Sequence, residues 1–378
     1  MNNINDKLSV VGIGKLGLCF ALTLEAAGYE VLGVDIRQDY VDLLNKGIVH
    51  TSEPGVANSL KAAKRFRATT SIEEAVAFGN LQFVVVATPS LASGRYDHSH
   101  VERIVNQLVA LGKQGATKHL ALCCTVMPKY TDSVAERLAP YNYTVSYNPE
   151  FIAQGTILRD QKSPDMVLIG EGSTEAGNIL EDIYKQHTDS HPSICRMKPV
   201  EAEIAKLSLN CFLTTKIAFA NMVGDIAVAS GADPDKILDA IGSDSRVNKK
   251  YLKYGFGFGG PCFPRDNRAL GMYALDIGCP AEISKATDKA NHLHLIEQVR
   301  LFDQANHKVK STAVFTMEGV SYKKGSTILE ESQQLKRAVE IAKLGYKVCV
   351  EDCREVLAEV QKNHGNLFTY RIVENSNA

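Results

Sequence analysis

Alternation between short apolar runs and helical patterns is the feature that most constrains how this chain can fold. Six runs rich in strand-forming residues occupy the first 170 residues: "LSVVGI", "YEVLGVD", "QFVVVAT", "HLALCCT", "YTVSYN" and "DMVLIG". Short, nearly continuous apolar runs separated by helical patterns are typical of a parallel, doubly wound sheet whose strands are buried on both faces. The sequence therefore predicts an α/β protein with an N-terminal Rossmann-like sheet.

The pattern changes after the first 198 residues. From Pro199 to about Gly231, apolar residues recur at helical spacing, with Pro at the start and Gly at the end, which predicts one long helix. A further helix is expected in "PDKILDAIG". Strands return after Lys310 in "STAVFTMEG", "YKVCVED" and "NLFTYRIV", with helical stretches near 331–344 and 354–363. We expect three parts: a Rossmann-like domain over 1–198, a central helical region over 199–300 and a small C-terminal α/β domain over 301–378.

Charge and cysteine content exclude several classes of protein. The 42 basic and 43 acidic residues give a net charge of −1, which argues against non-specific nucleic-acid or membrane-surface binding. We find no apolar run of membrane-spanning length, and the N-terminus lacks the organisation of a signal peptide, so we expect the mature protein to begin here. Nine cysteines without a CxxC pair indicate reduced thiols, a cytoplasmic location and no metal site.

A glycine-rich turn follows the first run. Gly12, Gly14 and Gly17 stand in G-x-G-x-x-G order around Lys15 and Leu16, directly after a strand and at the start of a helix. Such a turn lets the backbone approach a pyrophosphate, whose charge is stabilised at the helix N-terminus. The pattern and its context predict a dinucleotide site.

An acidic residue indicates which dinucleotide binds. Asp35 ends the next strand, 18 residues after Gly17, where a carboxylate can bind both ribose hydroxyls. Such a carboxylate would repel the extra phosphate of NADP, so NAD is the expected cofactor. Arg37 could instead hold that phosphate, remain solvated or stack on adenine. Thr88, Pro89 and Thr125 follow two other strands and are either cofactor contacts or ordinary polar strand exits.

Three further segments carry polar residues. Glu203, Lys206 and Asn210 are spaced by three and four on the long helix, so they share one face. That face is either solvated, or lets Lys206 and Asn210 hold a developing oxyanion. Glu150 follows a strand, where a helix cap, an ion-pair partner and a base are all open readings.

The third segment is "GFGFGGPCFPRDNRAL", in which Cys262 precedes Arg265 and Asp266 at the start of a helix. The positive end of a helix and a nearby cation favour the thiolate, which is the nucleophilic form. A reactive thiol and a structural thiol both fit the loop by itself.

Taken together, these motifs resemble the UDP-glucose/GDP-mannose dehydrogenase family, and within it most closely the members that oxidise UDP-glucose. The matching segments, in family order, are "VGIGKLG", "VVVATP", "NPEFIAQGT", "SPDMVLIG", "EAEIAKLSLNCF", "KIAFAN", "DSRVNKKYLKYGFGFGGPCFPRD" and, more faintly, "GVSYKKGSTILEES". They run from residue 8 to about residue 332.

The resemblance implies a cytoplasmic enzyme that oxidises the C6 alcohol of a nucleotide sugar to a carboxylate, most simply UDP-glucose to UDP-glucuronate, with two NAD reduced in turn. It implies that Cys262 captures the aldehyde as a thiohemiacetal, which a second oxidation converts to a thioester. Lys206 and Asn210 match residues that stabilise oxyanions, Asp266 a carboxylate that handles protons and water, and Glu150 a glutamate of thioester hydrolysis.

Binding residues follow from the same resemblance. It implies a homodimer formed through the long helix, in which Arg246 reaches the substrate of the neighbouring subunit. The other expected substrate contacts, besides Lys206 and Asn210, are Phe151, Ile152, Tyr251, Lys253, Phe256, Gly257, Gly259 and Lys323. Arg265 is expected beside the cofactor.

The chain departs from the family pattern at several positions. Arg265 replaces a lysine and Gln154 a glutamate or arginine, while Gly325, Ser326 and Glu330 replace an Asp, a Thr and an Arg. The C-terminal lobe, which helps to bind the nucleotide, is also shorter than usual. Two alternatives therefore remain open: a homologue that binds nucleotide without catalysis, and a single-step hydroxyacid dehydrogenase of similar architecture.

Overall fold

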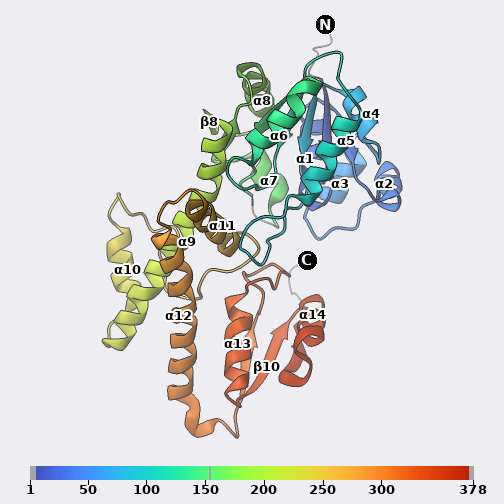
Figure 1. Cartoon of the computed structure of the whole chain (residues 1–378). Helices are drawn as coiled ribbons and strands as arrows, with labels where there is room; N and C mark the ends of the chain where they lie inside the picture. Colours follow the sequence, from blue (N-terminus) through green and yellow to red (C-terminus); the bar gives the residue numbers. More distant parts are fainter. Residues whose placement is uncertain (1–5, 153–154, 374–378) are drawn as a thin grey trace. The chain divides into compact units, whose positions relative to one another are not determined.

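The computed structural model describes residues 6–152 and 155–373. Its contacts divide the chain into two compact units, Met1–Lys206 and Leu207–Ala378. Figure 1 shows both units and labels many of their elements. Each unit is described by itself below.

An eight-stranded sheet forms the centre of the first unit. Its strands, in chain order, are β1 (Lys7–Val11), β2 (Glu30–Val34), β3 (Phe66–Thr69), β4 (Leu81–Val84), β5 (Lys118–Leu122), β6 (Tyr143–Tyr147), β7 (Met166–Gly170) and β8 (Ser193–Met197). Their spatial order is β3-β2-β1-β4-β5-β6-β7-β8. The order reverses between β1 and β4, and ligands of such sheets bind outside the carboxyl ends of the strands at that point.

The six predicted strands are all present, which confirms the Rossmann-like fold class. The sequence patterns missed β3 and β8, which are the two edge strands and are only partly buried, so neither has a continuous apolar run. The pairing of β6 with β7 is antiparallel, at Tyr147 and Gly170, whereas the other neighbours in this sheet run parallel. A buried strand has the same apolar pattern in either direction, so the sequence could not show this reversal.

Helices cover both faces of the sheet (Figure 1). They are α1 (Lys15–Ala26), α2 (Gln38–Asn45), α3 (Val56–Ala62), α4 (Ile72–Phe78), α5 (Ser99–Ala110), α6 (Tyr130–Leu138), α7 (Ile157–Lys162) and α8 (Thr174–His187), with a 3-10 turn η1 (Ala139–Tyr141). Consecutive strand residues face opposite sides: Val10 lies in the core beneath α1, α2, α3, α7 and α8, and Val11 in the core beneath α4, α5 and α6.

The long helix α9 (Pro199–Ala229) begins at the predicted proline and ends two residues before the predicted end. By length and composition it could cross a membrane, contrary to our expectation that no segment would qualify, although a core helix of a soluble protein passes the same test. Several polar residues of α9 are buried, while several of its large apolar residues are exposed. Its buried polar side chains are Glu203, Lys206, Asn210, Thr214 and Asn221, and its exposed large apolar ones include Phe212, Phe219, Met222 and Ile226.

The second unit contains the rest of α9, three more helices besides the two that flank its sheet, and a small sheet. The strands β9 (Val314–Glu318), β10 (Lys347–Asp352) and β11 (Thr369–Ile372) are parallel, in the order β11-β10-β9. The helical elements are α10 (Pro234–Gly242), α11 (Phe263–Asp276), α12 (Glu282–Asn306), α13 (Gln333–Lys343) and α14 (Arg354–His364), with 3-10 turns η2 (His307–Val309) and η3 (Gly365–Leu367). A separate apolar cluster that includes Val348, Val350 and Ile341 forms the core around this sheet.

Candidate functional site

The glycine turn lies where the strand order reverses, between the ends of β1 and β4. A Cβ atom added to Gly17 would lie 2.0 Å from the Gly12 carbonyl oxygen, and one added to Gly12 would lie 2.5 Å from that of Val85. Gly12 also has φ +94°. Both positions therefore require glycine for the backbone to close this turn. A Cβ on Gly14, the N-cap of α1, would instead meet nothing within 4 Å, which leaves open space in which a pyrophosphate fits against the helix N-terminus.

Asp35 follows β2 at the same edge of the sheet. Its Oδ1 accepts hydrogen bonds from the backbone nitrogen and Nε of Arg37, at 3.1 and 3.2 Å. The Arg37 guanidinium lies over the ring of Tyr40, 4.3 Å from its centroid. The structure shows a role for Arg37 that the sequence did not predict: its guanidinium pairs with Asp35 and stacks on the ring of Tyr40.

The two other predicted cofactor loops contact each other. The Thr88 hydroxyl donates to the Thr125 carbonyl oxygen at 2.7 Å, next to Pro89. His98, which the sequence analysis did not single out, accepts the backbone N–H of Met127 at 3.2 Å and stacks on Tyr130. Burial lowers the pKa of His98, so the ring is neutral and can accept this bond. These loops are held by bonds between one another as well as by their strands.

Lys15 connects the glycine turn to a distant loop. Its Nζ lies 3.8 Å from a carboxylate oxygen of Glu53, which is 4% exposed. The same carboxylate accepts the backbone N–H groups of Gly155 and Ile157, at 2.9 and 2.7 Å. Leu16 packs against the core beneath α1. Glu53 had no sequence signal, because its partners lie about a hundred residues away in the chain.

Glu150 stands after β6 in a polar but desolvated setting. Burial raises its pKa to about 7, against the opposing effects of a hydrogen bond from Tyr184 and the charge of Lys206. The Tyr184 hydroxyl lies 3.3 Å from Glu150 Oε1 and 2.9 Å from Asn148 Oδ1. A carboxyl with such a pKa can exchange a proton near neutral pH, which is what a general base requires.

Lys206 lies beside the same segment. Its Nζ donates to the Glu150 carbonyl oxygen at 2.9 Å and lies 4.4 Å from the ring centroid of Phe151. Phe151 and Ile152 pack against the two cores of the first unit. Glu203, one turn earlier, is fully buried and accepts the N–H groups of Lys129 and Thr131 at the start of α6, at 2.6 and 2.8 Å. The polar stripe on α9 is therefore buried rather than solvated, and Glu203 serves as a cap.

In the second unit, Cys262 is the N-cap residue of α11 and is exposed. One turn later, Asp266 is 3% exposed and its Oδ2 accepts a hydrogen bond from Asn210 Nδ2 at 2.6 Å. Arg265, between them, is partly exposed in the first turn. The start of α11 thus presents an accessible thiol at a helix N-terminus, with a buried carboxylate one turn later.

The glycines before Cys262 are closely packed by the protein itself. A Cβ atom on Gly257 would lie 2.3 Å from Asn291 Oδ1, on Gly259 2.4 Å from the Glu331 carbonyl oxygen, and on Gly260 2.4 Å from the Tyr322 ring. The Gly260 N–H donates to the Glu330 carbonyl oxygen at 3.1 Å. Gly257 and Gly259 are expected substrate contacts by resemblance, and the structure gives an independent reason for glycine at all three positions, namely the close approach of protein atoms.

The remaining predicted substrate residues have different surroundings. Arg246 is exposed and pairs with Asp244 Oδ2 at 2.8 Å. Lys253 and Phe256 are exposed. Tyr251 has φ +62° and its ring lies 6.2 Å from that of Phe263. Lys323 Nζ lies 5.8 Å from the centroid of the Tyr322 ring.

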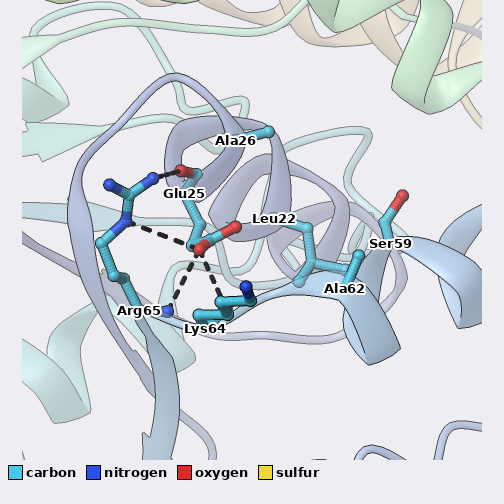
Figure 2. Close-up of a pocket in the computed structure, with 7 residues that line it drawn as sticks. All are labelled: Leu22, Glu25, Ala26, Ser59, Ala62, Lys64 and Arg65. Carbon is cyan, nitrogen blue, oxygen red and sulfur yellow. Dashed lines mark hydrogen bonds and ion pairs between the residues drawn. The ribbon is translucent and has the colours of Figure 1, made fainter.

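A surface depression lies apart from the predicted site residues. The depression in Figure 2, about 590 Å³, is lined by none of the predicted site residues, and its Glu25 carboxylate accepts the backbone N–H groups of Lys64 and Arg65, which is a structural role. Gln154 lies outside the described residues. Within residues 6–152 and 155–373, no cluster of three or more His, Cys, Asp or Glu could hold a metal ion.

Comparison with known proteins identifies the family. Residues 6–188 match the model of the UDP-glucose/GDP-mannose dehydrogenase family, NAD binding domain, and residues 200–293 match the central domain of the same family. The chain is 30% identical to the GDP-mannose 6-dehydrogenase of Pseudomonas aeruginosa over 363 residues, covering 92% of this chain and 81% of that protein. It is also 30% identical to the UDP-glucose 6-dehydrogenase of the same bacterium over 366 residues, covering 92% and 78%.

A solved structure agrees with these matches. The UDP-glucose dehydrogenase of the archaeon Pyrobaculum islandicum superposes with a TM-score of 0.87 at 31% identity, covering 98% of this chain and 86% of that one. The glycine turn that the sequence predicted as an NAD site lies within the matched NAD-binding domain, which confirms NAD as the cofactor. The chain therefore belongs to the UDP-glucose/GDP-mannose dehydrogenase family and is an NAD-dependent nucleotide-sugar dehydrogenase.

Proposed function

We propose that this protein oxidises the C6 alcohol of a nucleotide sugar to a carboxylate, through a covalent intermediate on Cys262. The observation that carries the proposal is the position of this thiol. Of the nine cysteines only Cys262 and Cys279 are exposed. Of these two, Cys262 is the N-cap of a helix, α11, with a buried carboxylate one turn away, whereas Cys353, the N-cap of α14, is only partly exposed. A four-electron oxidation that releases no aldehyde needs a covalent anchor of this kind.

Each polar group has a proposed part in the reaction. NAD, when bound, supplies the oxidising equivalents for both steps. Cys262 Sγ forms a bond to C6 of the aldehyde, giving a thiohemiacetal and, after the second oxidation, a thioester that water cleaves to the carboxylate. Lys206 and Asn210 donate hydrogen bonds to the oxygen on C6 as negative charge develops there. Asp266 relays protons, and Glu150 accepts a proton from the water that attacks the thioester.

The substrate contacts are proposed from the resemblance to the family. Phe151 and Ile152 are assigned to the sugar, together with the loop residues Phe256, Gly257 and Gly259. Three cations, Arg246, Lys253 and Lys323, are assigned to the diphosphate or nucleotide, and Tyr251 lies on the same segment as two of them. Cofactor contacts are assigned to the glycine turn, Asp35 and the loops at Thr88 and Thr125, with Arg265 beside them.

UDP-glucose is the proposed substrate, and GDP-mannose is the second candidate. Both choices have support, because the relatives that oxidise them are each 30% identical to this chain. Carboxylate formation at C6 is common to the two reactions. The second candidate differs only in the base and in the configuration of the sugar.

We further propose that the protein is a homodimer formed through α9. The exposed residues Phe212, Phe219, Met222 and Ile226 lie at spacings of seven, three and four, which places them on one face of the helix. Water-facing apolar side chains of this size and number mark an interaction surface. The dimer would allow Arg246, which is 87% exposed, to act on the substrate of the neighbouring subunit.

A screen of nucleotide sugars with NAD tests the proposed reaction. UDP-glucose should yield about two NADH per sugar consumed, since the product is a carboxylate rather than an aldehyde. GDP-mannose and other UDP-sugars are assayed in parallel by absorbance of NADH. A yield of one NADH per sugar would indicate a single-step dehydrogenase, and no turnover with any UDP- or GDP-sugar would refute the proposal.

Replacing the nucleophile tests the covalent step. Cys262→Ser should lower turnover by roughly 10³-fold or more, because a hydroxyl is a far weaker nucleophile than a thiolate at neutral pH. Cys279→Ser, at the other exposed cysteine, is the matched control and should behave like the unmodified protein. If Cys262→Ser keeps full turnover, the assignment is wrong. Equal ligand binding by both forms, measured by calorimetry, with no turnover by either would favour a binding protein without catalysis.

The pH dependence of turnover tests Glu150. Its active form as a base is the carboxylate, and burial raises its pKa to about 7, so turnover should rise with pH through that value. Glu150→Gln should remove this rise and lower turnover by about 10²-fold. The matched control is Glu136→Gln, at an exposed position on α6. An unchanged pH profile in Glu150→Gln would exclude this glutamate as the base.

Light scattering coupled to size-exclusion chromatography tests the dimer. The protein should elute at twice its chain mass of 41.3 kDa. Phe219→Glu should shift the population towards the monomer, because it places a charge within the apolar face of α9. Leu344→Glu, at an exposed apolar residue after α13, is the control and should leave the mass unchanged. A monomer at every concentration of the unmodified protein would contradict the proposal.

A further inference from the structure

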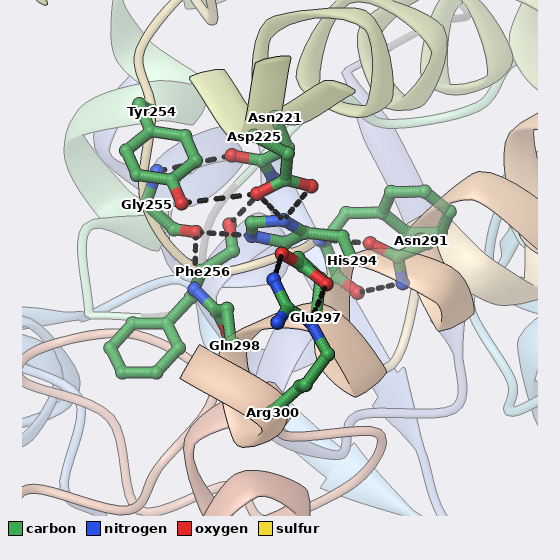
Figure 3. A network of polar contacts seen from close by, with 11 residues as sticks. Asn221, Asp225, Tyr254, Gly255, Phe256, Asn291, His294, Glu297, Gln298 and Arg300 are labelled. Atoms are coloured by element: carbon green, nitrogen blue, oxygen red, sulfur yellow. Dashed lines mark hydrogen bonds and ion pairs between the residues drawn. The ribbon is translucent and has the colours of Figure 1, made fainter. Parts of the chain in front are cut away.

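The loop that leads to Cys262 is held in place by side chains rather than by secondary structure. We call residues 255–260, "GFGFGG", the glycine loop. A segment this rich in glycine loses more conformational freedom on ordering than any other, so it needs bonds to fix it. Figure 3 shows these bonds, which come from two helices, α9 and α12.

Two asparagines bind the backbone of the loop. Asn221 Oδ1 on α9 accepts the Gly255 N–H at 3.0 Å, and its Nδ2 lies 3.3 Å from the Phe256 carbonyl oxygen. Asn291 on α12 binds both polar groups of Phe258, accepting its N–H at 2.8 Å and donating to its carbonyl oxygen at 2.9 Å. Both asparagines are buried. The loop backbone is therefore bonded to the two helices at Gly255, Phe256 and Phe258.

The Gly255 carbonyl oxygen has a different partner, His294 of α12. His294 is 4% exposed, and its Nε2 lies 2.7 Å from this oxygen. Its other ring nitrogen, Nδ1, lies 2.8 and 3.0 Å from the two carboxylate oxygens of Asp225 on α9. Gln298 Nε2 donates to the same carbonyl oxygen at 2.9 Å.

This geometry specifies the charge of His294. A carbonyl oxygen and a carboxylate can only accept hydrogen bonds, so each ring nitrogen must donate one. A neutral imidazole has a single N–H and would direct a lone pair at one of the two acceptors. The arrangement is satisfied by the imidazolium, whose charge Asp225 balances.

The other groups around the ring are accounted for. The Tyr254 hydroxyl donates to Asp225 Oδ1 at 3.0 Å, and its ring contacts His294 edge-on. Glu297 on α12 is paired with Arg300 at 2.5 Å. The guanidinium of Arg337, on α13, lies 5.9 Å from the ring of Phe256. Asp225 is thus the carboxylate bonded to the His294 ring, whereas the carboxylate of Glu297 is paired with Arg300.

We propose that His294, as an imidazolium paired with Asp225, is a positioning residue that fixes the Gly255 carbonyl and thereby holds the glycine loop in the form that binds the nucleotide sugar. The inference rests on the proposed function for the identity of that ligand, but the protonation state and the order of the loop are properties of the chain alone. Without the His294 side chain, the bond between Gly255 and Asp225 through the ring is lost and the loop loosens. A merely structural ion pair would leave substrate affinity unchanged.

The first test needs no substrate. Protein labelled with 15N-histidine is examined by NMR, in which an imidazolium and the two neutral tautomers have distinct nitrogen shifts, and the His294 signal is identified by its loss in His294→Gln. We expect the imidazolium at neutral pH, and a smaller imidazolium population in Asp225→Asn, which removes the balancing charge with little change in volume. A neutral His294 in the unmodified protein at neutral pH would overturn the proposal, and the protonation state is read from the unmodified protein itself.

Hydrogen exchange and kinetics give the second test. His294→Gln should increase deuterium uptake in the peptide that contains the glycine loop but not in the peptide that contains β10. Its KM for the nucleotide sugar should rise roughly tenfold or more, the effect of losing a bond from a charged donor, while its KM for NAD stays unchanged. Asp225→Asn, which removes the charge that balances the imidazolium, should also raise the KM for the sugar. His292→Gln, at an exposed position on the same helix, is the matched control.

The outcomes separate the two proposals. If no nucleotide sugar is oxidised but His294 is cationic and its replacement loosens the loop, the proposed function fails and the positioning role of His294 stands. If turnover is found while His294→Gln leaves loop exchange and the KM for the sugar unchanged, the function stands and the positioning role is wrong.

Discussion

The buried polar side chains of α9 are the feature on which the candidate site residues of each unit depend. Four of its side chains each bind a different segment: Glu203 the start of α6, Lys206 the carbonyl of Glu150, Asn210 the carboxylate of Asp266, and Asn221 the glycine loop. A buried polar group without a partner costs about 1–3 kcal/mol, so each of these bonds constrains the segment that supplies the partner. Within each unit, α9 thereby holds segments that lie far from it in the chain.

The opposite face of α9 follows from the same distribution. Because its polar residues point inward, its large apolar residues Phe212, Phe219, Met222 and Ile226 remain exposed. A helix that uses its inward face for hydrogen bonds and its outward face for apolar contact is suited to a protein that both builds a site and associates. These exposed residues also contribute to the apolar composition of α9, which together with its length would allow it to cross a membrane.

Local sequence was sufficient for the nucleotide-binding turn. Gly12 and Gly17 close a turn that no larger side chain would allow, and Asp35 ends the following strand, so spacing alone located these groups. Six strands and the boundaries of α9 were predicted for the same reason, since periodicity and capping residues are local properties. The edge strands β3 and β8 escaped prediction because partial burial leaves no continuous apolar run. The roles assigned to Cys262 and Asp266 came from motif resemblance and stay predictions.

The sequence by itself determined the fold class, the NAD-binding turn and the placement of a cysteine at the start of a helix, because each depends on residues within a few positions of one another. Only the tertiary structure decided which side chains support them. Glu53 binds the backbone at Gly155 and Ile157, Tyr184 contacts Glu150, and His294 with Asp225 holds Gly255. These partners are separated by some thirty to a hundred residues, and the path of the chain, which no local pattern encodes, brings them within hydrogen-bond distance.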